Sequence, residues 1–155
     1  MREKFNSFIK NLQKQITNRL CELEKKNDFT TEEWFRKEGG GGITCVIENG
    51  LVFEKGGVNT SEVYGKLTKS AKNQLKTKFE NFFACGISII IHPKNPMAPI
   101  FHANLRYFEL YDDDNNIVDK WFGGGMDLTP FYICLLYTSD AADEGLGVDL
   151  GGRRI

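Results

Sequence analysis

The stretch Ile89–Leu110, IIIHPKNPMAPIFHANLRYFEL, decides the fold class because it contains two runs of strand-like residues joined by a loop with three prolines. Aliphatic and aromatic residues recur at alternate positions in both runs, and side chains of a β-strand point alternately to its two faces. The pattern predicts two antiparallel strands, over residues 86–92 and 100–110, with one apolar and one polar side each.

The polar sides of these two strands carry an unusual set of residues. In the first strand Ser88, Ile90 and His92 share a side, opposite three isoleucines, and in the second His102 and Asn104 begin the polar side. Arg106 and Phe108 continue that side, whereas Phe101, Ala103, Leu105 and Tyr107 share the other. A solvent-exposed sheet face is one interpretation. Histidine, asparagine and arginine mixed with apolar residues favour the other, a partly dry cleft for an anionic ligand.

The N-terminal third predicts helices. Apolar residues recur at helical spacing between Phe5 and Leu23, which indicates an amphipathic helix. Thr30 and Glu33 match a capping box, so we expect a short helix through Trp34 and Phe35, ended by the glycine run at 39–42.

The remaining segments predict strands. Two β-rich runs meet at Asn49 and Gly50, a tight-turn signal, and residues 116–124 form a further run. The lysine-rich segment 66–83 is typical of a solvated helix or loop. Helices followed by consecutive strands predict an α+β fold with a mostly antiparallel sheet flanked by helices.

Composition limits the protein class. The chain has 155 residues, 41% of them hydrophobic, and a formal net charge of −1, as expected of one soluble domain and not of a general nucleic-acid binder. The sequence shows no signal peptide and no transmembrane segment, so we expect a cytoplasmic location. Its four cysteines form no CxxC pair, which favours reduced thiols over a zinc or redox site.

Two further features bear on a site. His92 and His102 are the only histidines, and they suit either a metal site that needs additional ligands or hydrogen bonding and proton transfer. Gly123–Gly125 match neither a P-loop nor a dinucleotide-binding motif, and we expect them to form a turn that aims Asp127. A plain turn or helix cap is the alternative for Asp127.

Three long motifs closely resemble the oxygen-dependent coproporphyrinogen III oxidase family. They are EGGGGITCVIENGLVFEKGGVNTS, FFACGISIIIHPKNPMAPIFHANLRYFEL and WFGGGMDLTPFY, in the order and approximate spacing of the family. The resemblance implies oxidative decarboxylation of two propionates of coproporphyrinogen III to vinyl groups, giving protoporphyrinogen IX in haem biosynthesis. It also implies O2 as co-substrate, no organic cofactor, a large antiparallel sheet and a homodimer. A non-catalytic tetrapyrrole-binding protein is the alternative function.

The resemblance also assigns roles to individual residues. Ser88 and the segment Asn104, Leu105 and Arg106 match substrate-binding positions, and His102 matches a proton donor. Asp127 matches a carboxylate that faces the centre of the macrocycle. His92 and His102 match metal ligands of bacterial members, whereas eukaryotic members are regarded as metal-independent, so a divalent metal stays undecided.

The resemblance covers residues 1–132, which correspond to the N-terminal half of a family member. Residues 133–155 match no part of the family, and we expect a disordered or artefactual tail. The sheet would then be incomplete and the chain an inactive fragment. The sequence motifs look more like those of eukaryotic members of the family than bacterial ones. A eukaryotic parent protein would allow a mitochondrial location.

Overall fold

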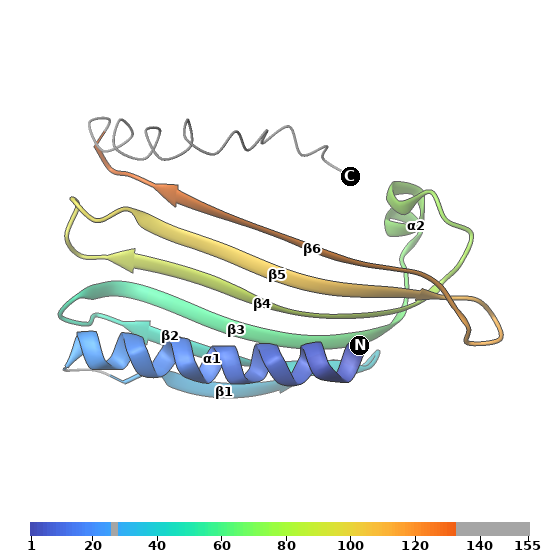
Figure 1. The fold of residues 1–155 in the computed structure, drawn as a ribbon, viewed down its shortest axis with the longest axis horizontal. Helices are drawn as coiled ribbons and strands as arrows, with labels where there is room; N and C mark the ends of the chain where they lie inside the picture. Colours follow the sequence, from blue (N-terminus) through green and yellow to red (C-terminus); the bar gives the residue numbers. More distant parts are fainter. Residues whose placement is uncertain (26–27, 133–155) are drawn as a thin grey trace.

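The computed structural model describes residues 1–25 and 28–132. In these residues the element order is α1 (Arg2–Glu24), β1 (Thr30–Phe35), β2 (Gly40–Glu48), β3 (Phe53–Lys66), α2 (Lys69–Leu75), β4 (Asn81–Pro93), β5 (Ile100–Tyr111) and β6 (Ile117–Thr129). The strands form one six-stranded sheet in sequential order, and every neighbouring pair is antiparallel. The expected α+β fold is therefore confirmed (Figure 1).

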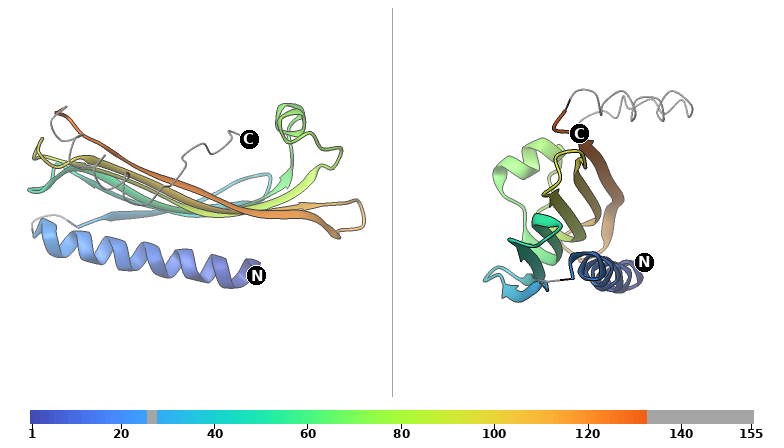
Figure 2. Two further views of the ribbon diagram at one scale, coloured as in Figure 1. Left: turned by 45° about the horizontal axis from the view of Figure 1, so that its top comes forward. Right: turned by 90° about the vertical axis from the view of Figure 1, so that its left-hand side faces the viewer.

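Helix α1 lies along one face of the sheet, and α2 projects from the opposite side at one end (Figure 2). The face that carries α1 is called here the helix-side face, and the other is called the site face. Neither described helix has the length and apolar composition needed to cross a lipid bilayer. The core lies between α1 and the central strands. Its buried members are Ile9, Ile47, Phe53, Val58, Phe83, Cys85, Ile87, Ile89, Ile91 and Tyr107.

The predicted N-terminal helix is confirmed, but its buried surface is not purely apolar. Ile9 is buried, whereas Phe8 and Leu23 are exposed. Gln13 is buried in place of an apolar residue, and its Nε2 donates to the carbonyl oxygens of Ile43 and Val58 at 2.9 and 2.7 Å. The Thr60 hydroxyl donates to the Gln13 Oε1 at 3.0 Å. These bonds fix the helix against β2 and β3, and they satisfy a side chain that would otherwise be costly to bury.

The predicted short helix through Trp34 and Phe35 is wrong. Residues Thr30–Phe35 form β1, which pairs with β2 over Gly41–Val46. Hydrogen bonds to a whole neighbouring strand outweigh one local capping pattern, and β-branched and aromatic residues suit a strand. The glycine run does not end a helix either. Gly39 and Gly40 have positive φ, and Gly40, Gly41 and Gly42 belong to β2.

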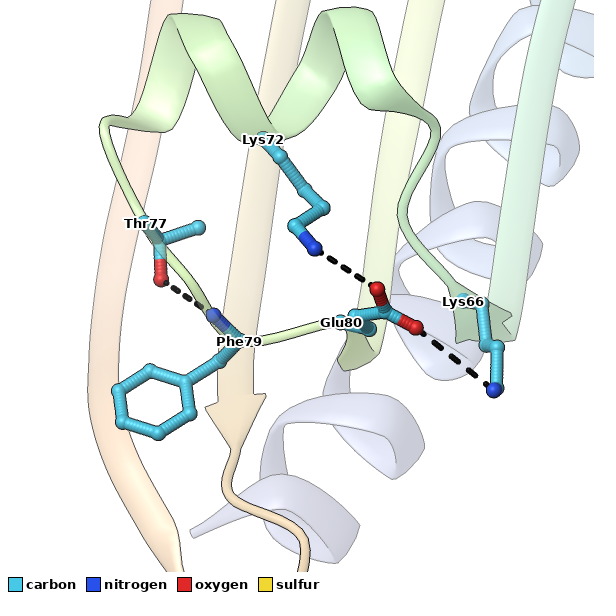
Figure 3. Close-up of polar contacts among 5 residues, drawn as sticks. All are labelled: Lys66, Lys72, Thr77, Phe79 and Glu80. Atoms are coloured by element: carbon cyan, nitrogen blue, oxygen red, sulfur yellow. Dashed lines mark hydrogen bonds and ion pairs between the residues drawn. The ribbon is translucent and has the colours of Figure 1, made fainter.

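The other predicted elements are found with adjusted ends. A turn joins β2 to β3 at Asn49 and Gly50 as predicted, but it spans residues 49–52 and is longer than a tight two-residue turn; Asn49 has a φ of 56°. The lysine-rich segment holds α2, which is capped by the Thr68 hydroxyl. Ion pairs join the segment after α2 to α2 itself and to the end of β3 (Figure 3). The Glu80 carboxylate lies 2.7 Å from the Lys72 Nζ and 3.6 Å from the Lys66 Nζ.

The expected turn at Gly123–Gly125 is wrong, because all three glycines lie inside β6. They pair with Arg106, Leu105 and Asn104 of β5, so the backbone is extended there. Asp127 is consequently placed by strand register and not by a glycine turn.

Candidate active site

The polar sides of β4 and β5 lie together on the site face, as predicted. Ser88 is paired with Asn104 and Ile90 with His102, so the polar residues of the two strands occupy neighbouring rows. The opposite side of β4, with Ile87 and Ile89, is buried beneath α1. The side chain of Leu105, a predicted substrate-binding residue, points to the helix-side face. Only its backbone is therefore available on the site face.

Strand β6 adds Asp127 to this surface. His102 and Asp127 are direct partners across β5 and β6, and the Nδ1 of His102 lies 3.1 Å from the Oδ2 of Asp127. The Thr129 hydroxyl donates to the same oxygen at 2.9 Å. The bond from Thr129, then that from His102, lowers the pKa of Asp127, although partial burial opposes this shift. Asp127 is therefore ionised near neutral pH and can hold the His102 ring with Nδ1 protonated.

This arrangement gives each group a chemical capability. With Nδ1 donating to Asp127, a neutral His102 presents Nε2 as a proton acceptor, and a charged one presents it as a donor. Both described contacts of Asp127 involve Oδ2, so within the described part of the chain Oδ1 is left to accept hydrogen bonds from a ligand.

Arg106 lies one row away from Asn104 and between two glycines. Its partners across the sheet are Gly86 of β4 and Gly123 of β6. Arg106 is exposed, and its guanidinium can bind a carboxylate with two parallel hydrogen bonds. Ser88, Asn104 and Arg106 line one hollow of about 340 Å³ on the site face.

Sequence analysis missed the far wall of this hollow. Trp34, Thr44, Asn59 and Ser61 also line it. The register continues the polar row from Ser88 to Asn59 of β3 and on to Thr44 of β2. The alternation of polar and apolar residues in the segments GITCVIE and GGVNTSEV indicates that each strand has a polar side. Only the strand register shows that these polar sides lie on the site face. The buried Oδ1 of Asn59 has no hydrogen-bond partner among the described residues.

An aromatic stack borders the site on the side of α2. The rings of Phe82 and Phe108 lie 5.7 Å apart, and those of Phe108 and Trp121 lie 4.4 Å apart, both nearly parallel. Phe108 follows Arg106 by two residues and so shares its face. The stack gives the polar rows an apolar boundary, as ligand sites commonly have.

The two histidines do not by themselves make a metal site. Their ring centroids are 6.2 Å apart with an edge-to-face geometry. No group of three or more His, Cys, Asp or Glu residues is placed to hold a metal ion within residues 1–25 and 28–132. Two imidazoles leave a metal site incomplete, and Asp127 is already bound to Nδ1 of one of them. The described residues therefore do not fit a metal centre.

Comparison with known proteins places these motifs in one family. The family model for coproporphyrinogen III oxidase matches residues 4–142, which extends beyond Tyr132, where the sequence motifs stop. The expected tail at residues 133–155 lies outside the described residues.

Similar proteins come from animals and bacteria. The mitochondrial oxygen-dependent coproporphyrinogen-III oxidase of Mus musculus is 49% identical over 142 residues, covering 86% of this chain and 32% of that protein. The corresponding oxidase of Drosophila melanogaster is 43% identical and covers 86% and 36%. That of Prochlorococcus marinus strain MIT 9515 is 47% identical and covers 84% and 37%. The chain spans about a third of the length of the curated relatives it matches. By this family match, the chain belongs to the coproporphyrinogen III oxidase family.

Proposed function

We propose that the protein containing this chain converts coproporphyrinogen III to protoporphyrinogen IX with O2 as the oxidant. The observation that carries the proposal is the placement of His102, Asp127 and Arg106 on one open face beside Ser88 and Asn104. The names of the relatives, oxygen-dependent coproporphyrinogen-III oxidases, support the same reaction.

The reaction is a two-electron oxidation of each propionate arm. A hydrogen leaves the carbon next to the ring, the carboxylate leaves as CO2, and a vinyl group forms. The two electrons reduce O2, which takes up two protons and becomes hydrogen peroxide. Protons must therefore move at the arm and at the reduced oxygen. His102 is suited to this task because one ring nitrogen contacts Asp127 and the other can accept or donate a proton.

Asp127 and Arg106 have separate roles in this proposal. The Oδ1 of Asp127 accepts hydrogen bonds from pyrrole N–H groups of the macrocycle, while Oδ2 orients His102. Arg106 binds a propionate carboxylate, and Ser88 and Asn104 donate further hydrogen bonds to the substrate. These roles use the chain's own residues and require no organic cofactor.

Assembly and location are also proposals. We expect a homodimer, which sedimentation of the purified protein would detect. We expect a cytoplasmic location, or a mitochondrial one as named for the mouse relative, and cell fractionation would distinguish them. We expect no association with nucleic acid, as the nearly neutral net charge indicates.

The function is tested in a joined protein, in which residues 1–132 are followed by the C-terminal portion of the mouse relative. Aerobic incubation with coproporphyrinogen III should give protoporphyrinogen IX and consume O2. A folded joined protein that binds the substrate without consuming O2 would instead favour a non-catalytic tetrapyrrole-binding protein.

A further inference from the structure

Gly123 and Gly125 lie in the interior of β6, where glycine is an unfavourable choice. Glycine loses more conformational freedom on folding than other residues, and it has no side chain to pack in a sheet. Strand interiors usually carry it where the backbone has an unusual conformation, where space is lacking, or where another group approaches closely. The structure allows the first two reasons to be tested for each glycine of the run.

Backbone conformation does not require these glycines. Within the described residues, the glycines with positive φ are Gly39, Gly40 and Gly65, so the run in β6 has a conformation that other residues adopt. Lack of space does not require them either. A Cβ atom added at Gly123 would meet no described atom within 4 Å. A Cβ at Gly125 would meet only the side-chain nitrogen of Asn104, at 3.9 Å, which is an ordinary contact.

Gly124 between them behaves differently. It lies on the helix-side face, opposite Leu105, and a Cβ there would come within 2.7 Å of the Asn104 carbonyl oxygen. Real Cβ atoms essentially never come so close, so packing explains why this position is glycine. Packing explains one glycine of the run and leaves the other two unexplained.

The two unexplained glycines lie beside the groups of the site. Gly123 is the strand partner of Arg106, and Gly125 is the partner of Asn104. Gly125 also precedes Asp127 by two residues, so both project toward the same face. Their missing side chains leave a strip of bare backbone next to Arg106, Asn104 and Asp127.

We propose that Gly123 and Gly125 form a floor on which the tetrapyrrole macrocycle rests in contact with the backbone of β6. This inference rests on the proposed function. The floor sets the height of the ring above the sheet, so that Asp127 reaches the pyrrole N–H groups while Arg106 reaches a propionate. A methyl group at either position would lift the ring by about 1.5 Å, the length of a carbon–carbon bond. A misplacement of about 1 Å can reduce a reaction rate about 100-fold.

The test compares three alanine variants of the 155-residue chain. Gly123→Ala and Gly125→Ala remove the floor, and Gly124→Ala is the matched control on the other face. Coproporphyrin III, a stable oxidised analogue, is the probe, and quenching of tryptophan fluorescence measures its binding. The readout is local because Trp34 and Trp121 are the only tryptophans, and both lie on the site face. Urea unfolding gives the stability of each variant.

We expect Gly123→Ala and Gly125→Ala to bind the probe at least about tenfold more weakly, with an unchanged or raised unfolding midpoint. Gly124→Ala should have a lowered midpoint. Affinity within twofold of the unsubstituted chain, or loss of stability in the first two variants, would overturn the inference. So would an unsubstituted chain that does not bind the probe. Turnover by the joined protein decides separately whether the proposed function stands, so the two failures are distinguishable.

Discussion

His102 and Asp127 face each other across β5 and β6, with Nδ1 of the histidine 3.1 Å from Oδ2 of the aspartate. The pair joins two residues to which the sequence motifs assigned separate roles, one as proton donor and one as central carboxylate. A shared hydrogen bond makes these roles interdependent, because the carboxylate fixes which ring nitrogen carries the proton. Thr129 holds the same carboxylate from two residues away.

Asp127→Asn should therefore reduce turnover of the joined protein by about 100-fold or more, the usual range for loss of a positioned proton-transfer group. The amide has nearly the same shape but cannot hold a charged imidazole, nor accept as strongly from pyrrole N–H groups. Steady-state kinetics over a range of pH measure the effect. Lys94→Ala, an exposed residue just after β4, is the control and should keep the activity. Near-normal turnover of Asp127→Asn would remove the carboxylate from the mechanism.

Arg106→Lys should weaken substrate binding in the joined protein more than it slows turnover. Lysine keeps the charge but cannot make the two parallel bonds of a guanidinium to a carboxylate. The expected rise in KM is about tenfold, which corresponds to roughly 1.4 kcal/mol, about the contribution of one charge-assisted hydrogen bond. Arg19→Lys on the exposed side of α1 is the matched control. A KM equal to that of the control would mean that Arg106 does not bind a propionate.

Much of the sheet was predictable because its central strands are strongly patterned. The predicted strands at 86–92 and 100–110 lie within β4 and β5, and their polar sides share a face as expected. A local pattern is enough where alternation is long and one face is buried. It was not enough for β1, where a six-residue segment with a capping signal became a strand only because β2 pairs with it.

The contact between His102 and Asp127 could not be predicted, because it depends on the register of β6. The connection from β5 contains a register shift at Leu110 and Tyr111, and Asn115 has a φ of 61°. A slip of one residue would move Asp127 to the helix-side face. Asn59 and Thr44 were missed for the same reason. Asn59 of β3 is brought to the site by its pairing with Ser88, and Thr44 of β2 by its pairing with Asn59.

Glu24→Gln should lower the stability of the chain at neutral pH. Glu24 is buried at the end of α1, and it accepts hydrogen bonds from the backbone N–H groups of Leu51, Val52 and Phe53. Burial raises its pKa, but these bonds, with the nearby charge of Lys94, outweigh that effect, and the net pKa lies below its usual range. Glutamine keeps the shape but loses the charge-assisted bonds at the turn between β2 and β3.

The pH dependence of this effect has a defined sign. Because the pKa is lower in the folded state, the carboxylate stabilises the fold above its unfolded pKa, and this stability is lost as pH falls through the folded pKa. The unfolding midpoint of Glu24→Gln in urea should therefore lie below that of the unsubstituted chain at pH 7 and approach it in acid. Glu22→Gln, an exposed neighbour on α1, should change little at either pH. A constant difference across this range would contradict the assignment.

The helix-side face of β5 and β6 should make the 155-residue chain self-associate. Helix α1 packs mainly on β3 and β4 and touches β6 through an edge-to-face contact between Phe5 and Phe122, whereas the apolar side chains further along β6 are left open. Phe122, Met126 and Leu128 are 54%, 74% and 50% exposed, and Leu105 lies beside them. β6 is also an edge of the described sheet, and an apolar patch next to an open edge promotes association.

Replacing Met126 and Leu128 together by threonine should reduce both association and binding of a hydrophobic dye by about half, since threonine keeps the preference for a strand but removes apolar surface. Sedimentation at several concentrations measures the first effect and dye fluorescence the second. Leu51→Thr removes an equally exposed leucine from the turn between β2 and β3, away from the patch, and should leave both unchanged. A monodisperse monomer with no dye binding at all tested concentrations would show that this face does not drive association.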